Sequence, residues 1–220
     1  MAARSVRAQQ AAPLLTDKFG TRRTQAARGQ GRAAGEDLTW LIDPLCGTVP
    51  FAAGMDHWGV NIALRRGGSL ELGVLAMPSL GETLAAVRGR GVKRNGRRWR
   101  PPAPGAALGE STIGLEIDGG IEWRRLLRRG LSWVPECGQI NIFASAAYPM
   151  GQVCLGRLPA AVFYGIEPVH LAAGACVALE LGCRVTDAGG SEVDWTGDAA
   201  LAVVVAGWPA AHAQLIQAMG

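Results

Sequence analysis

The spacing of apolar residues along the chain predicts a mixture of strands and helices. Alternating apolar and polar positions predict two strands over 58–64 and 70–75, joined by a Gly-rich turn at 66–68. Further strands are expected at 40–42, 84–87, 111–116, 160–164, 185–187 and 201–206, and helices at 6–19, 120–129, 145–155, 171–181 and 209–219. Strands and helices in this order predict a layered α+β architecture.

Breaks in the pattern suggest how the chain is divided. The stretch 20–36 is rich in Gly, Arg and Ala without periodicity, which predicts a loop. A second break in the pattern comes at residues 101–104, where three of the four residues are proline. We therefore expect two halves, residues 1–100 and 101–220, each with its own strands and helices.

Composition narrows the function classes. The net charge of +4 comes largely from Arg clusters, but no nucleic-acid-binding motif accompanies them, so we expect no nucleic-acid partner. The five cysteines show no CxxC pairing, which argues against a disulfide framework, and Cys176 and Cys183 are expected in the core. No apolar run is long enough to cross a bilayer and no leader is evident, so we expect no membrane contact and a cytoplasmic location.

The segment 40–48 carries the strongest chemical signal. It combines a short apolar strand, a turn at Pro44 and a helix that starts at Gly47 and Thr48. Backbone N–H groups at a helix start lack intrahelical partners and point outward. The carboxylate of Asp43 and the thiol of Cys46 flank this start, which predicts a functional site.

The same segment, read as WLIDPLCGTVPFAAG, resembles the signature of the inositol monophosphatase family. The usual form is Asp-Pro-Ile/Leu-Asp-Gly-Thr followed by Asn-Phe, and the likeness continues through 77–96, 144–147, 171–174 and 181–187. The resemblance implies a layered αβαβα sandwich with the active site between the two halves. It also implies a possible homodimer.

The departures from the family pattern fall on its metal ligands. Family members hold magnesium with a Glu, the two signature Asp residues and a later Asp, a set of hard oxygen donors. Here Asp43 alone matches: the second signature position is Cys46, the late position is His170, and the stretch 20–24 offers no acid. We therefore expect no bound metal or cofactor and no ordinary magnesium-dependent phosphatase chemistry.

The substrate contacts of the family are altered as well. Positions that the resemblance assigns to the substrate pocket hold Phe163, Asn141 and Ser145, and Pro159 replaces a further acid. A pocket in which Phe and Pro replace acidic side chains is expected to prefer a more apolar ligand.

The substitutions suggest an activated cysteine. Because the resemblance makes positions 46 and 170 ligands of one ion, Cys46 and His170 should lie close together, near Asp43. This predicts Cys46 as nucleophile, His170 as base and Asp43 as the acid that orients it, with the N–H groups of Gly47 and Thr48 as an oxyanion hole. The helix start is expected to lower the thiol pKa.

Such a site suits acyl-thioester chemistry. The expected reactions are capture and off-loading of a small, possibly carrier-bound acyl substrate, or its Dieckmann-type cyclisation, as in the Cys/His/Asp cyclases that the triad resembles. Three alternatives stay open: a catalytically dead phosphatase-like binding or regulatory protein, a phosphatase with an altered metal site, and a catalytic zinc site at the same three residues.

Overall fold

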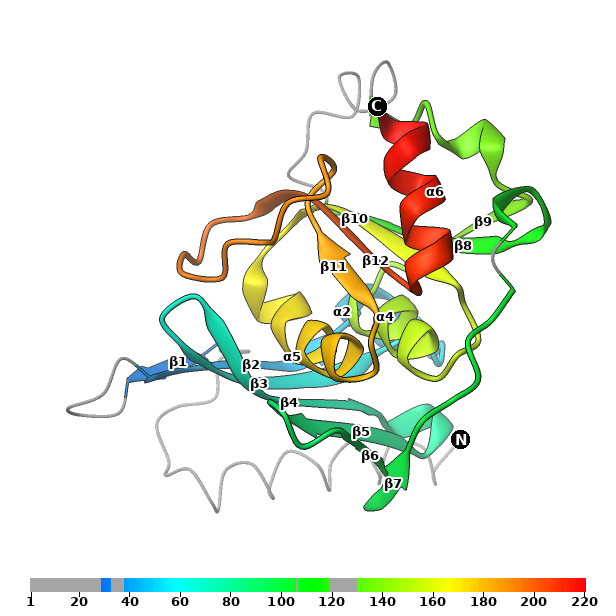
Figure 1. Ribbon diagram of the computed structural model, residues 1–220. Coiled ribbons are helices and arrows are strands. Elements are labelled where there is room, and N and C mark those ends of the chain that lie inside the picture. The colour runs from blue at the N-terminus through cyan, green and yellow to red at the C-terminus, as the bar shows by residue number, and fades with distance from the viewer. Residues whose placement is uncertain (1–28, 33–37, 106, 119–129) are drawn as a thin grey trace.

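The computed structural model describes residues 29–32, 38–105, 107–118 and 130–220, and it contains two β-sheets (Figure 1). The first is a 7-stranded sheet in which each strand pairs antiparallel with the next along the chain. Its strands are β1 (Gly29–Arg32), β2 (Leu38–Cys46), β3 (Gly59–Arg66), β4 (Ser69–Met77), β5 (Glu82–Val87), β6 (Val92–Arg94) and β7 (Arg97–Trp99).

The second sheet is 5-stranded, with the order β11-β12-β10-β8-β9. Strand β8 pairs in parallel with β10 and β9, and the other pairs are antiparallel. Its strands are β8 (Thr112–Ile117), β9 (Gln139–Ile142), β10 (Ala160–Ile166), β11 (Arg184–Thr186) and β12 (Leu201–Gly207).

Helices form the layers that separate and cover the sheets. Helices α4 (Ala147–Cys154) and α5 (Pro168–Glu180) lie between the two sheets, and α6 (Pro209–Met219) lies on the outer face of the second sheet (Figure 1). The shorter helices are α2 (Thr48–Ala52) and the 3₁₀ turns η1 (Pro78–Leu80), η2 (Leu108–Glu110) and η4 (Val134–Glu136). The β-α-β-α order of layers confirms the α+β sandwich.

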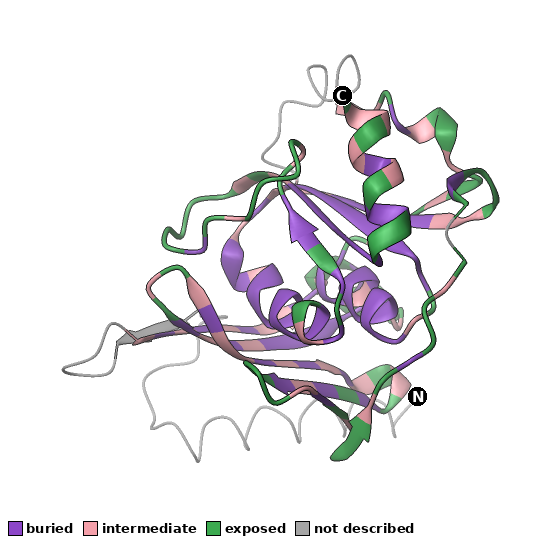
Figure 2. Ribbon diagram, in the orientation of Figure 1, coloured by how far each residue is buried: buried purple, intermediate pink, exposed green. Residues whose placement is uncertain are grey.

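Small residues bring helix α5 close to the first sheet. The helix is buried on almost every side (Figure 2), as expected of a helix that is apolar all round. A Cβ added to Gly73 of β4 would lie 2.3 Å from the carbonyl oxygen of Ala173. A glycine is therefore required at this crossing, and α5 is held firmly against the strands that carry the site.

Most of the expected elements are confirmed, but four strands, β1, β6, β7 and β9, are not among them. Part of the expected loop 20–36 forms β1, which pairs with β2. Strand β9 is not among the expected strands, because its alternating sequence QINI covers only four residues and three of them are exposed. The expected helices 6–19 and 120–129 lie outside the described residues, and the division into residues 1–100 and 101–220 stays a prediction.

None of the helices in the described ranges is long and apolar enough to cross a membrane.

Candidate functional site

A β-bulge at the end of β2 places two site residues on one face of the sheet. Asp43 pairs with Asn61 and Cys46 with Gly59, so three steps along β2 match two steps along β3. In a regular strand, residues three apart point to opposite faces, and one extra residue reverses this. Pro44, which cannot donate to the ladder, lies inside the bulge. As a result, both side chains line the same cavity.

Helix α5 brings His170 to Asp43. The helix begins at Pro168, so His170 lies in its first turn. The imidazole Nδ1 lies 2.5 Å from Oδ2 of Asp43, and the backbone N–H of Leu45 donates to Oδ1 at 3.1 Å. Both side chains are nearly buried, with 11% and 4% of their surface exposed. The second imidazole nitrogen, Nε2, lies 3.9 Å from Oε2 of Glu167.

Cys46 completes a cluster of three different donor types. A carboxylate oxygen of Asp43, the sulfur of Cys46 and a ring nitrogen of His170 all lie within 4.8 Å of one another. The Sγ atom accepts a hydrogen bond from the backbone N–H of Ala147 at 3.3 Å. Burial and then the negative charge of Asp43 raise the pKa of the Cys46 thiol to about 12. Without a bound ion, this thiol is therefore neutral at physiological pH.

The second sheet contributes Glu116 at the end of β8. Its carboxylate accepts backbone hydrogen bonds from Phe143 at 2.7 Å and Ser145 at 3.1 Å. Ala144, between them, has a φ of 53°, a conformation that non-glycine residues rarely adopt. Burial raises the pKa of Glu116 to about 8, although the backbone hydrogen bonds oppose the shift. The loop at 143–145 is thus folded around this carboxyl group.

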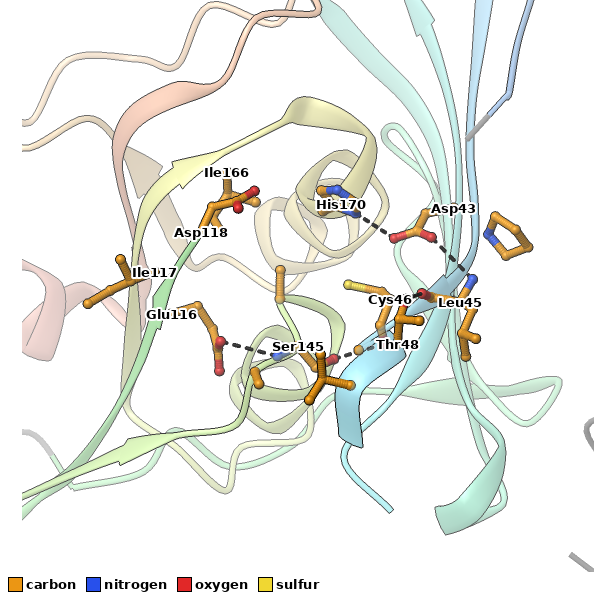
Figure 3. Close-up of a pocket in the computed structure, with 15 residues that line it drawn as sticks. Asp43, Leu45, Cys46, Thr48, Glu116, Ile117, Asp118, Ser145, Ile166 and His170 are labelled. Carbon is orange, nitrogen blue, oxygen red and sulfur yellow. Dashed lines mark hydrogen bonds and ion pairs between the residues drawn. The ribbon is translucent and has the colours of Figure 1, made fainter. Parts of the chain in front are cut away.

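Ser145 links β2 of the first sheet to β8 of the second sheet. Its hydroxyl donates to the carbonyl oxygen of Cys46 at 3.0 Å and accepts from the backbone N–H of Tyr148 at 3.3 Å. Figure 3 shows Ser145 between Glu116 on one side and Cys46 on the other. The first sheet, the second sheet and the start of α4 therefore meet at this serine.

These residues surround a cavity of about 420 Å³ that is lined by residues of both sheets (Figure 3). It is lined by Asp43, Pro44, Leu45, Cys46, Gly47, Thr48, Val49, Glu116, Ile117, Asp118, Ala144, Ser145, Ala146, Ile166 and His170.

Of the expected site residues, six line this cavity and two do not. Asp43, Cys46, Gly47, Thr48, Ser145 and His170 do so. Phe163 is fully buried in the core and Asn141 lies exposed on β9, so neither lines the cavity. Sequence reasoning missed Glu116, although an acid inside the otherwise apolar segment TIGLEI is an unusual feature.

The comparison with family models decides the family. The model of the inositol monophosphatase family matches residues 7–220. The chain belongs to this family.

Curated relatives of this inositol monophosphatase family member include a Thermotoga maritima fructose-1,6-bisphosphatase/inositol-1-monophosphatase. It is 34% identical over 161 residues, which cover 72% of this chain and 60% of the relative. The Nus factor SuhB of Pseudomonas aeruginosa is 34% identical over 168 residues, covering 74% and 61%. The chain thus spans about three-fifths of the length of these relatives.

Solved structures agree with the fold. A SuhB protein from Bartonella henselae superposes with a TM-score of 0.69 at 28% identity, covering 82% of this chain and 71% of that one. The inositol monophosphatase of Thermotoga maritima gives a TM-score of 0.73 at 26% identity, covering 94% and 78%.

The expectation of cysteine acyl-thioester chemistry is wrong. The family and these relatives are phosphatases and SuhB proteins, not acyltransferases or Dieckmann cyclases. The physical basis expected for a nucleophile is also missing. Helix α2 has only five residues, and the pKa of the Cys46 thiol is raised rather than lowered. The grouping of Cys46, His170 and Asp43 is real, but it does not make a catalytic triad of this chain.

Magnesium does not fit the donor set found here. Mg²⁺ requires near-octahedral oxygen coordination and is poorly served by sulfur or nitrogen. The cluster offers one carboxylate, one thiol and one imidazole. The ion implied by the family resemblance is therefore mismatched with these side chains.

Proposed function

We propose that this chain is a divergent phosphatase that has lost most of the family's magnesium ligands and hydrolyses a phosphate monoester with an altered metal site. One observation carries the proposal: the segment 43–48 and His170 line a single cavity together with Glu116 of β8 and Ser145. Family membership and the phosphatase among the relatives support the same reaction class.

The cavity wall favours an ester whose alcohol part is partly apolar. Leu45, Val49, Ile117 and Ile166 lie among the lining residues, together with the polar groups of the site. Apolar walls with a few placed polar groups are typical of small-molecule pockets. These four residues, rather than Phe163, supply the apolar character expected from the sequence.

The polar residues have separate tasks in this proposal. In the metal-free cluster, the contact between Oδ2 of Asp43 and Nδ1 of His170 keeps the imidazole directed into the cavity. Ser145 ties the carbonyl of Cys46 to the loop at 143–145, so the cavity keeps its shape when a ligand enters. Precise placement of this kind contributes to catalysis because small displacements at a reacting centre lower the rate.

Phosphate release tests the proposal. Chelator-treated protein is assayed with inositol 1-phosphate, fructose 1,6-bisphosphate and p-nitrophenyl phosphate, each with Mg²⁺, Mn²⁺ or Zn²⁺. We expect release with a transition metal ion, and at least about a 10-fold loss in His170→Asn. Cys137→Ser is the matched control, because Cys137 lies outside the cavity. Absence of phosphate release with every ester and ion would contradict the proposal.

A non-hydrolysing phosphate-ester-binding protein is the second candidate. It is favoured by the replacement of two acids of the family pattern with Cys46 and His170. Calorimetric binding of an ester without phosphate release would support this candidate over the first.

Two further expectations belong to the proposal. A cytoplasmic location is supported by the five cysteines, all of which are free, as is usual in reducing compartments. A homodimer is expected from the family resemblance, and light scattering on the purified protein measures it.

A further inference from the structure

The three donors that do not suit magnesium suit a softer ion. Thiolate and imidazole ligands select ions such as Zn²⁺, and one carboxylate is compatible with them. Catalytic zinc sites commonly have three protein ligands and one position open to water or substrate. In this chain the donors come from Asp43, Cys46 and His170, and all three line the cavity.

We propose that Asp43, Cys46 and His170 form a binding site for a divalent ion of intermediate softness, such as Zn²⁺, in place of the magnesium site of the family. The inference rests on the proposed function, because it identifies the metal ion that the proposed phosphatase would use. The geometry of the site and the test of metal binding do not depend on whether the protein hydrolyses a substrate.

The separations in the cluster fit one ion after a small adjustment. Zn–S bonds of about 2.3 Å and Zn–N or Zn–O bonds of about 2.0–2.2 Å place tetrahedral ligand atoms roughly 3.3–3.6 Å apart. The donor atoms here all lie within 4.8 Å of one another, and Nδ1 of His170 lies 2.5 Å from Oδ2 of Asp43. An increase of about 1 Å in the separation of Nδ1 and Oδ2, through rotation of the two side chains, would bring these atoms to the spacing of ligands of one ion.

The surroundings of each donor resemble a metal-supporting shell. Metal-binding histidines usually direct their second ring nitrogen toward a carboxylate or carbonyl. In His170, Nδ1 faces the cluster and Nε2 lies 3.9 Å from the carboxylate of Glu167. The N–H of Leu45 donates to Oδ1 of Asp43, which leaves Oδ2 directed into the cluster. The N–H of Ala147 points at Sγ of Cys46, as expected beside a thiolate ligand.

An unsatisfied amide beside the cluster is a second, independent indication. Asn61 pairs directly with Asp43 across β2 and β3, so the two side chains lie on the same face of the sheet. Asn61 is 1% exposed, and neither Nδ2 nor Oδ1 has a hydrogen-bond partner among the described residues. Buried amides are almost always paired. Water carried by a hydrated ion at Asp43 would supply the missing partner.

Cobalt spectroscopy tests the inference without any substrate. Chelator-treated full-length protein is titrated with Co²⁺, whose bond to a thiolate gives a charge-transfer absorption in the near ultraviolet. We expect one Co²⁺ per chain with this band, displacement by Zn²⁺, and no displacement by a large excess of Mg²⁺. The band should be lost in Cys46→Ser and kept in Cys137→Ser, the matched control.

Variants at His170 and Glu167 distinguish a loss of metal binding from a loss of folding. His170→Asn should weaken Zn²⁺ binding strongly, because it removes the nitrogen ligand, and Glu167→Gln, which changes a carboxylate 3.9 Å from Nε2, should weaken it less. Circular dichroism confirms that each variant is folded. A band that persists in Cys46→Ser, a folded wild type without the band, or equal competition by Mg²⁺ would overturn the inference.

The outcomes also separate this inference from the proposed function. A Cys46-dependent cobalt band without phosphate release would support the metal site and contradict the proposed hydrolysis. Phosphate release that persists in Cys46→Ser and responds to Mg²⁺ would contradict the proposed metal site and support the hydrolysis.

Discussion

Among single residues, Cys46 shows how burial decides chemistry. A reactive cysteine needs an exposed or electropositive setting that stabilises the thiolate. Cys46 is 4% exposed and lies beside Asp43, so both burial and charge raise the pKa of its thiol to about 12. The same thiol is a good ligand, because a bound cation stabilises the deprotonated sulfur directly. The residue type is thus compatible with two chemistries, and its surroundings favour ligation.

Glu116 is expected to make the protein less stable as pH rises, whereas most carboxyl groups in proteins have the opposite effect. Burial raises the pKa of its carboxyl group to about 8, so between its ordinary value and about 8 the folded protein holds a proton that the unfolded chain has lost. This contribution to the free energy of unfolding therefore falls as pH rises through that window. Glu116→Gln, which cannot ionise, should show a smaller loss of stability between pH 5.5 and 8.5 than the wild type.

Urea unfolding at the two pH values measures this difference. Glu110→Gln is the matched control, because Glu110 is exposed at the end of η2. The same pH dependence in Glu116→Gln and the wild type would show that Glu116 does not titrate in the folded protein as proposed.

At the scale of elements, the site depends on the turn from β2 into α2. Gly47 has a φ of +97°, and a Cβ added there would lie 2.7 Å from the carbonyl oxygen of His57 and 2.8 Å from Cβ of Ser145. Backbone at positive φ costs a residue with a side chain about 1–2 kcal/mol. At Gly47 a steric clash with backbone adds to this strain.

Gly47→Ala should therefore destabilise the protein more than strain alone. Gly54, at the end of the same short helix, has a φ of +75° with nothing within 4 Å of an added Cβ. Gly54→Ala should cost about 1–2 kcal/mol from strain, whereas Gly47→Ala should cost at least about 1–3 kcal/mol more. Chemical denaturation of both variants measures the losses. Equal losses would mean that β2 and α2 move apart easily at this turn.

Helix α6 is fixed to the second sheet by a buried histidine. The hydroxyl of Thr186 donates to the carbonyl of Asp187, so it accepts from Nε2 of His212 at 2.8 Å. Burial, with a contribution from the charge of Arg184, lowers the pKa of His212. Because the folded state favours the neutral ring, this stabilisation is present above the usual histidine pKa and is lost as pH falls below it.

We expect His212→Gln to lose less thermal stability than the wild type between pH 7 and pH 5. The variant removes the group whose protonation opposes folding, at some cost in stability at pH 7. His57→Gln, which changes a half-buried histidine near the cavity, is the control. A wild-type melting temperature that falls no further than that of His212→Gln would contradict this assignment.

For the whole molecule, the fold could be predicted from the sequence where one face of an element is buried. Strands β3 and β4 alternate because the helix layer covers one of their faces. Strand β9 alternates over only four residues, three of which are exposed, so its pattern is too short to predict a strand. Phe163 was assigned to the pocket by its place in the family motif, but strand β10 is buried along almost its entire length. Its side chain therefore packs into the core.

The candidate site could be predicted only in part. The segment 43–48 and His170 follow from the family signature, and the structure brings them together. Burial of Cys46 and the loop around Glu116 depend on how the two sheets pack, and no local sequence pattern encodes that. The choice between nucleophile and ligand therefore depends on the assembled cleft.

The ion preference of the whole cleft should be reversible through two positions. In Cys46→Asp/His170→Asp the cluster would offer oxygen donors alone, which match the hard coordination that Mg²⁺ prefers. Without metal, three adjacent buried carboxylates repel one another, so the variant should be less stable than the wild type. Millimolar Mg²⁺ should raise its melting temperature, whereas the wild type should respond to Zn²⁺ and not to Mg²⁺. Cys46→Ser/His170→Asn controls for loss of the original donors and should respond to neither ion. A double Asp variant that still prefers Zn²⁺ would mean that other groups in the cleft, and not these two side chains, select the ion.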